Sequence, residues 1–157
     1  MALGDQTLKL VGEKAVEDLR KELDDQGHTL TGALDKSITA DVEGDGLDIL
    51  AEGYMKYVND GFPAKSASMK QFPFVVKYWQ QRALGEEEAK RAAAATIHKW
   101  MKEGMPTGTS MAHSRNERRT KAIREALENN NQIDTYIEVG LDSELDDIWE
   151  MDKTEII

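Results

Sequence analysis

The pattern of apolar and polar positions predicts a long amphipathic helix near the start of the chain. From Asp5 to Gln26, apolar residues recur three and four positions apart, with acids and lysines between them. The recurring positions are Leu8, Val11, Ala15, Leu19 and Leu23. This spacing gathers the apolar side chains on one side of a helix, so that side is expected to be buried, and Gly27 marks the expected end. A short helical turn at residues 33–35, capped by Thr29 or Thr31, is expected next.

The following segments alternate apolar and polar residues with the period of two that is typical of β-strands. Ile38, Ala40 and Val42 alternate in residues 37–43, and Leu47, Ile49 and Ala51 alternate in residues 47–52. Between the two segments lie Gly44, Asp45 and Gly46, which are residue types that accept the positive φ of a tight turn. The pattern therefore predicts a β-hairpin with one buried face.

The stretch DVEGDGLDILAE, residues 41–52, also matches the ligand spacing of a calcium-binding EF-hand loop. The matching positions are Asp41, Glu43, Asp45, Gly46 and Glu52. That interpretation requires a helix on each side of the loop, whereas the flanking residues alternate as strands do and Gly53 interrupts the segment that follows. The periodicity favours the hairpin.

Four further helices and a third strand are predicted after the hairpin. A short helix has Tyr54, Tyr57 and Val58 on one side and ends at Gly61, and a loop leads to a helix that begins at Pro73. Gly85 opens a second long helix, whose predicted buried positions are Ala89, Ala92, Ala93, Thr96, Ile97, Trp100 and Met101. Residues 115–131 predict another helix, with Ala122, Ile123, Ala126 and Leu127 inside and basic residues outside. In residues 133–139 the period returns to two, with Ile133, Ile137 and Val139 on one face, which predicts a third strand beside the hairpin.

The expected fold class is therefore α+β. A small antiparallel sheet, made of the hairpin and the C-terminal strand, packs with the long N-terminal helix and two to three further helices. Residues 1–140 are expected to form a single domain with a helical insertion at about residues 62–104. Residues 141–157 form an acidic tail that still carries large apolar side chains, so we expect the tail to dock on its own domain or on a neighbour. The expected docking residues are Leu145, Ile148, Trp149, Ile156 and Ile157.

Charge is unevenly distributed along the 157 residues, whose formal net charge is −10. Residues 1–60 sum to −8, residues 61–130 to +6 and residues 131–157 to −8. A free-standing nucleic-acid binder is usually basic overall, because counterion release supplies much of its affinity. Surfaces of opposite charge on one subunit can instead guide its copies to pack head to tail.

The sequence lacks the motifs typical of catalysis, metal binding and membrane insertion. The chain has no cysteine, and His28, His98 and His113 stand apart from other potential ligands. There is no nucleophile elbow and no phosphate-binding loop, and the acid pairs at 24–25 and 146–147 lie in highly charged surroundings. No apolar run approaches the roughly 20 residues that a membrane span needs. We expect a soluble non-enzyme without cofactor or metal.

The basic face of the helix predicted at 115–131 is the charged feature most open to interpretation. Its residues are Arg115, Arg118, Arg119, Lys121 and Arg124. Such a face can simply be solvated, can pair with the acidic tail or N-terminal helix of the same or an adjacent copy, or can contact DNA phosphates. The last possibility is the basis of an alternative hypothesis, a nucleic-acid-associated regulatory protein that uses this helix.

The order of elements resembles that of the tail-completion, or head-to-tail joining, proteins of tailed bacteriophages, which are minor tail or neck components. The amphipathic helix is followed by LTGALDKSI (residues 30–38), the hairpin and YMKYVNDGF (residues 54–62), each similar to a stretch of that family. The later segments IHKWMKEG, RRTKAIREAL and IDTYIEV fit larger members, so the resemblance covers roughly residues 6–140. The long insertion between Gly61 and Trp100 and the acidic tail depart from the family pattern.

The resemblance implies a structural virion protein that is assembled in the host cytoplasm. It implies a ring of six or twelve copies at the head-tail junction, between portal-side connector proteins and the tail, with genome DNA passing through the lumen. It implies no catalytic residue. The uneven charge suits such a ring, since each subunit must fit a different face of the next one. A lumen for outgoing DNA is best lined by acidic or neutral groups, because a basic lining would retain the DNA.

Overall fold

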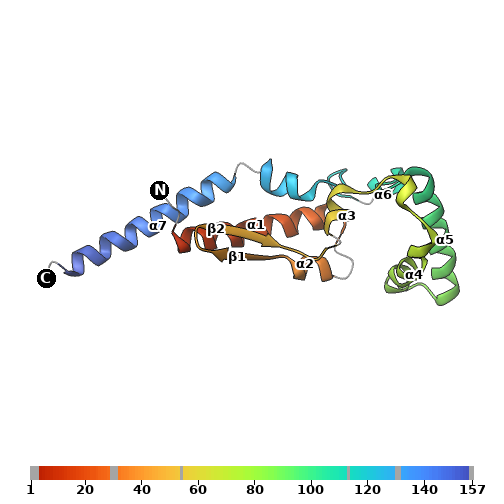
Figure 1. The fold of residues 1–157 in the computed structure, drawn as a ribbon, viewed down its shortest axis with the longest axis horizontal. Coiled ribbons are helices and arrows are strands. Elements are labelled where there is room, and N and C mark those ends of the chain that lie inside the picture. The colour runs from red at the N-terminus through yellow and green to blue at the C-terminus, as the bar shows by residue number, and fades with distance from the viewer. Residues whose placement is uncertain (1–3, 29–31, 54, 113, 130–131, 156–157) are drawn as a thin grey trace. The chain divides into compact units, whose positions relative to one another are not determined.

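The computed structural model describes residues 4–28, 32–53, 55–112, 114–129 and 132–155, the last five of these by their backbone alone. The chain forms two compact units, which we describe separately (Figure 1). Unit 1 comprises residues 1–24, 32–53 and 122–157, and unit 2 comprises residues 25–31 and 54–121.

Unit 1 is built around the first helix. Its elements are α1 (Asp5–Asp25), α2 (Ala33–Ser37), β1 (Thr39–Glu43), β2 (Gly46–Leu50), the π-helical turn η3 (Arg124–Glu128) and α7 (Gln132–Glu155). Every position of the predicted stripe on α1 is buried, and so are Gly12 and Val16 on the same helix. The long N-terminal helix is therefore confirmed, with its end at Asp25 followed by Gly27 at φ 75°.

The hairpin is confirmed, and its buried face rests on α1. β1 and β2 pair antiparallel from Thr39 opposite Leu50 to Glu43 opposite Gly46, with Gly44 at φ 60° in the turn. The strand residues at 40, 42, 47 and 49 are half-buried, while those between them are exposed. A Cβ on Gly12 would lie 2.8 Å from the Ala40 Cβ and 2.8 Å from the Leu47 Cδ1. The hairpin can approach α1 this closely because position 12 has no side chain.

The predicted third strand is wrong, because residues 133–139 belong to helix α7. Ile133, Ile137 and Val139 share a face at a period of two, yet Ile133, Ile137 and Leu141 also fall on one side of a helix. In the helix, Ile133, Ile137 and Leu141 are half-buried, whereas Val139 is 55% exposed. A Cβ on Gly140 would lie 2.8 Å from the Thr7 Cγ2 and 3.0 Å from the Thr7 Cα, so α7 crosses α1 in direct contact at Gly140.

Two polar contacts tie α7 to α1. The Thr7 backbone N–H donates to the Glu144 Oε1 at 2.7 Å, which satisfies a donor in the first turn of α1. More than two turns earlier along α7, the Tyr136 hydroxyl donates to the Asp18 Oδ2 at 3.2 Å or to the Gln132 Oε1 at 2.7 Å. Packing against α1 therefore selects the helix over the strand in this segment.

Unit 2 contains a helical hairpin with its own core. Its elements are α3 (Met55–Asp60), the 3₁₀ turns η1 (Ala64–Ser66) and η2 (Met69–Gln71), α4 (Phe72–Gln81), α5 (Glu86–Glu103) and α6 (Gly108–Met111). The core consists of Val75, Ala93 and Ile97, packed with Phe72, Val76, Trp79 and Trp100. The Trp79 indole N–H donates to the Thr96 hydroxyl at 3.0 Å, which joins α4 to α5.

The helices predicted from Pro73 and Gly85 are confirmed, and the predicted buried side of α5 is correct except at one position. Met101 is 46% exposed, because the core of the helical hairpin ends at Trp100. The short helix that ends before Gly61 is confirmed as α3, and Gly61 has φ 67°. In α3 Met55 is 5% exposed, Val58 is half-buried and Tyr57 is 62% exposed. Tyr54, like the predicted caps Thr29 and Thr31, lies outside the described residues.

The basic helix is also wrong over residues 115–121, which follow an irregular path. Glu117 and Lys121 have φ of 60° and 62°, values that a right-handed helix excludes. Helical structure begins only at Ala122, which is buried together with Ala126. Main-chain and side-chain groups of the irregular segment instead bind the carbonyls at the end of α1.

Candidate interaction surfaces

The irregular basic segment donates hydrogen bonds to the carbonyls of residues 25–27, at the C-terminal end of α1. These three residues belong to unit 2. The Arg115 N–H donates to the Asp25 carbonyl at 2.7 Å, and the Ser114 hydroxyl donates to the same oxygen at 3.3 Å. The Arg119 Nη1 donates to the Gly27 carbonyl at 3.1 Å and also to the Gln26 carbonyl. Carbonyls at a helix C-terminus lack hydrogen-bond donors within the helix and carry partial negative charge. A guanidinium supplies both the donors and a positive charge. Arg119 is therefore a structural residue.

The environment of Arg119 affects a neighbouring histidine. The His28 Nε2 lies 2.9 Å from the Arg119 carbonyl oxygen, which places the proton of the neutral ring on Nε2. Burial, aided by the positive charge of Arg119, lowers the pKa of His28 from 6.5 to about 4. Burial also lowers the pKa of Arg119, with a further lowering contribution from Arg82 and an opposing one from Tyr78. His28 thus stays neutral at physiological pH.

The five basic residues predicted to share one face do not do so. Arg115 is 72% exposed and its Nη1 lies 3.9 Å from the Asp25 Oδ1. Arg118 and Lys121 are exposed in the irregular segment of unit 2. Arg124 belongs to unit 1, where its Nε lies 3.7 Å from the Glu128 Oε2 in the next turn of η3. Among the described residues, the predicted basic patch is therefore divided between two units, with its Arg119 turned inward.

The predicted docking residues of the tail lie on an exposed part of α7. The side chains of Leu145, Ile148 and Trp149 are 61%, 59% and 65% exposed. They recur three and four positions apart, which places them on one side of the helix beyond its contacts with α1 at Gly140 and Glu144. We call these three residues the α7 stripe. Ile156 and Ile157 lie outside the described residues, and docking of the tail on a neighbour stays a prediction.

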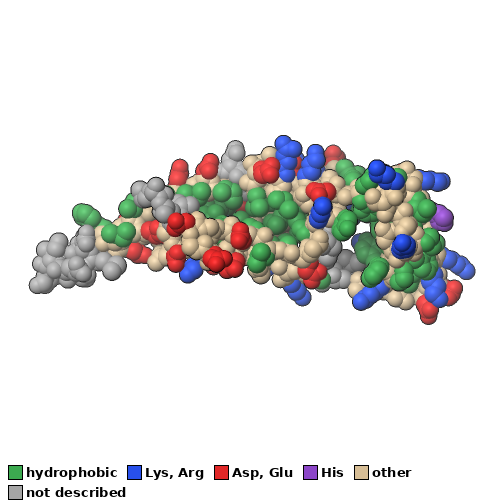
Figure 2. All heavy atoms as spheres, in the orientation of Figure 1, with side chains coloured by type: hydrophobic (Ala, Val, Ile, Leu, Met, Phe, Trp, Pro, Cys, Tyr) green, Lys and Arg blue, Asp and Glu red, His purple; other side chains and the backbone are tan. Residues whose placement is uncertain are grey.

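A second exposed surface, on α4, was not singled out from the sequence. Phe74 is 76% exposed and Tyr78 36%, and Lys77 between them is exposed as well. The Arg82 guanidinium lies 4.8 Å from the centre of the Tyr78 ring and 5.9 Å from that of Trp79. We call Lys70, Phe74, Lys77, Tyr78 and Gln81 the α4 face, since they recur at helical spacing. Figure 2 shows hydrophobic side chains next to Lys and Arg in this part of unit 2.

The available signal for the α4 face was an excess of apolar residues. In the segment FPFVVKYW, Phe72, Val75, Val76 and Trp79 cover one side of the helix and enter the core. Phe74 and Tyr78 then fall on the other side, where a helix of a free-standing subunit usually carries polar residues. A helix that is apolar on two sides indicates a second buried surface.

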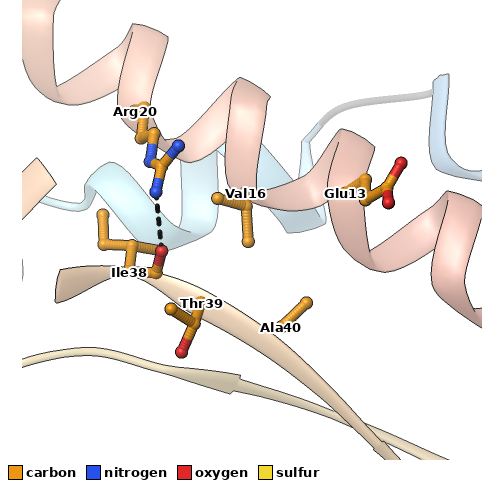
Figure 3. Close-up of a pocket in the computed structure, with 6 residues that line it drawn as sticks. All are labelled: Glu13, Val16, Arg20, Ile38, Thr39 and Ala40. Carbon is orange, nitrogen blue, oxygen red and sulfur yellow. Dashed lines mark hydrogen bonds between the residues drawn. The ribbon is translucent and has the colours of Figure 1, made fainter. Parts of the chain in front are cut away.

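Unit 1 has a hollow between α1 and β1 (Figure 3). Its lining residues are Glu13, Val16, Arg20, Ile38, Thr39 and Ala40. Arg20 points from α1 toward β1, where its Nη2 donates to the Ile38 carbonyl at 2.9 Å and its Nε donates to the Asp35 carbonyl at 3.0 Å. These bonds hold the α2–β1 connection against α1. Within this hollow, Arg20 therefore holds the backbone that precedes β1 in place.

Comparison with known proteins adds no relative. No family model, curated protein or solved structure matches the chain. Within the described part of the chain, no three His, Cys, Asp or Glu side chains gather to hold a metal, and no helix has both the length and the apolar content needed to cross a membrane. The hairpin strands occupy the residues that a calcium loop would have to wrap around an ion.

Charge differs sharply between the two units. Unit 1 contains 7 basic and 23 acidic residues, and unit 2 contains 13 basic and 7 acidic residues. Their formal net charges are therefore −16 and +6. Acidic side chains gather over α1, the hairpin and α7, whereas most Lys and Arg side chains lie over unit 2 (Figure 2). The chain thus presents one strongly acidic body and one basic body, each with exposed apolar side chains.

Proposed function

We propose that the chain is a structural subunit of the neck of a tailed bacteriophage, a head-to-tail joining protein whose copies form a ring. The proposed identity comes from the resemblance of the N-terminal helix, the hairpin and the helices that follow it, and not from the basic helix over 115–121 or the closing strand, which the structure does not form. It takes its physical support from the surfaces that the structure exposes. A subunit of a closed ring must offer two different faces that fit each other.

The observation that carries the proposal is the division of charge between the units. An acidic body of −16 and a basic body of +6 in one chain attract each other between copies and repel the wrong pairing of like bodies. Exposed apolar residues accompany both bodies, Leu145, Ile148 and Trp149 on the acidic one and Phe74 and Tyr78 on the basic one. Charge thereby selects the pairing, and the apolar side chains stabilise it.

The acidic excess also suits the passage of DNA. Unit 1 can line the lumen, because its net negative charge repels the phosphate backbone of DNA and does not retain it. The basic groups of unit 2 are then engaged at contacts between subunits or with neighbouring connector and tail proteins. Under this proposal the protein resides in the virion neck after assembly in the host cytoplasm.

The test is the assembly state of the purified chain. Light scattering coupled to size-exclusion chromatography at about 50 mM salt and at 500 mM salt is combined with negative-stain images of the low-salt sample. The proposal expects closed rings that dissociate as salt rises, because screening weakens contacts between exposed charges. A chain that stays monomeric at both salt concentrations, alone and with virion partners, contradicts the proposal.

The nucleic-acid regulator is a distinguishable outcome of the same preparation. It requires binding to duplex DNA that weakens steeply with salt and is lost on replacing Arg118 and Lys121 with glutamate. Arg119 is left unchanged in this variant, since its replacement would open the end of α1. Salt-sensitive DNA binding by a monomer would favour the regulator over the ring.

A further inference from the structure

The α7 stripe requires a cover, and its surroundings define the chemistry of that cover. Leu145, Ile148 and Trp149 are each more than half exposed on one side of a helix. The exposed acids Asp142 and Asp146 lie one turn apart along the flank of this row. Two copies of the α7 stripe packed together would bring these carboxylates side by side, which is unfavourable between closely spaced like charges. The charge pattern therefore favours a basic partner over a second α7.

The α4 face has the complementary composition. Phe74 and Tyr78 supply exposed aromatic surface, and Lys77 lies between them. Lys70 precedes Phe74 by four residues, in the turn η2 that leads directly into α4. The face therefore has an aromatic centre with a lysine at its start and another in its middle.

The two surfaces are complementary in charge, and both carry exposed apolar residues at helical spacing. A helix that carries apolar residues three and four apart packs on another helix through that row, and charges on the flanks fix the register. Aromatic side chains are enriched in the buried centres of protein interfaces, where the surrounding charges select the partner. Leu145, Ile148 and Phe74 are 61%, 59% and 76% exposed.

We propose that the α4 face of one copy packs on the α7 stripe of the next copy, with Lys70 and Lys77 beside Asp142 and Asp146. The inference rests on the proposed function, because it names the helix pair that joins neighbouring subunits of the ring. The contact joins two different surfaces, so a joined pair of copies still presents one α4 face and one α7 stripe to further neighbours. Such a contact continues from copy to copy until the circle closes.

Disulfide trapping tests the pairing directly, because the natural chain has no cysteine. A Lys77→Cys variant and an Ile148→Cys variant, one carrying a polyhistidine tag to distinguish their masses, are mixed under mild oxidation. We expect the mixed disulfide between the two variants to exceed each self-pairing at least five-fold. The matched control replaces Lys77→Cys with Ala95→Cys, an exposed position on α5, and is expected to form at least five-fold less mixed disulfide.

Charge exchange provides an independent measurement on the uncrosslinked chain. The Lys70→Glu and Lys77→Glu double variant is expected to weaken association at low salt at least ten-fold. Mixing it with the Asp142→Lys and Asp146→Lys double variant is expected to restore association, because opposite charges again face each other. All four side chains are exposed, and circular dichroism of each variant checks its fold.

Each outcome bears on one proposal or on both. Rings without a preferred mixed disulfide overturn the helix pairing and leave the proposed function standing. A dominant self-disulfide of the Ile148→Cys variant overturns the pairing in favour of α7 with α7. A mixed disulfide from a chain that forms no rings supports the pairing and counts against the ring. A monomeric chain without the mixed disulfide contradicts both proposals.

Discussion

Acidification is predicted to weaken unit 2 through a single side chain, His28. Its folded-state pKa of about 4 lies below the 6.5 of the free side chain, because the ring is buried beside the positive Arg119. Between these two values the unfolded chain holds a proton that the folded chain does not. The contribution of His28 to stability is therefore fully present above pH 6.5 and is lost as the pH falls toward 4.

The size of the effect follows from the same two values. Lowering the pH from 7 to 5 is expected to cost about 2 kcal/mol of unfolding free energy through His28, at 1.36 kcal/mol per pKa unit. With a urea dependence of about 1–3 kcal/mol per molar, the unfolding midpoint shifts by roughly 1 M. Carboxylates also begin to titrate over this range, so the effect of His28 must be isolated by comparison with a variant.

The assay is urea unfolding of the wild type and the His28→Gln variant at both pH values, followed by circular dichroism. Glutamine retains an N–H that can donate to the Arg119 carbonyl and does not titrate. We expect the variant to lose about 2 kcal/mol less than the wild type on acidification. His98→Gln, at an exposed position of α5, is the matched control and should behave as the wild type. Equal losses in the wild type and the His28→Gln variant would refute the reasoning, as would an NMR titration midpoint of His28 near 6.5.

Three further changes test the packing of the units by urea unfolding. Gly140→Ala places a Cβ 3.0 Å from the Thr7 Cα and should lower the stability of unit 1 by about 1–3 kcal/mol. The control Ser143→Ala, on the exposed side of α7, should have no such cost. Equal effects of the two substitutions would show that α7 does not pack on α1 at Gly140. Ile97→Ala removes a side chain of 0% exposure and should cost about 2–5 kcal/mol in unit 2; a loss below 1 kcal/mol would mean that the helical hairpin lacks the described core. Thr107→Ala removes the N-cap of α6 and should cost about 1 kcal/mol, and an unchanged midpoint would show that this cap is dispensable.

Local periodicity predicted the elements whose neighbours lie close in sequence. The α1 stripe, the hairpin and the two helices of unit 2 all agree with the structure, although the turn takes only residues 44 and 45 and Gly46 opens β2. In each case one face is buried and the period is unambiguous over the length of the element. The sequence did not reveal the α4 face, because an exposed aromatic residue and a buried one look alike until the packing partner of each side chain is known. Phe74 and Val75 differ in burial although they are adjacent in sequence.

The tertiary structure decided the segments whose pattern permits two structures. Ile133 and Ile137 fit a strand and a helix equally well, and contacts of Gly140 and Glu144 with Thr7, more than 130 residues away in sequence, select the helix. Residues 115–121 have helical composition, yet they form no helix in the structure. Their Arg119 guanidinium and Arg115 backbone N–H instead donate hydrogen bonds to carbonyls at the end of α1. Buried backbone groups must find partners, and when those partners are distant in sequence no local pattern encodes them. The sequence by itself thus determined the amphipathic elements and the alternation of charge, and only the tertiary structure divided that charge between an acidic and a basic body.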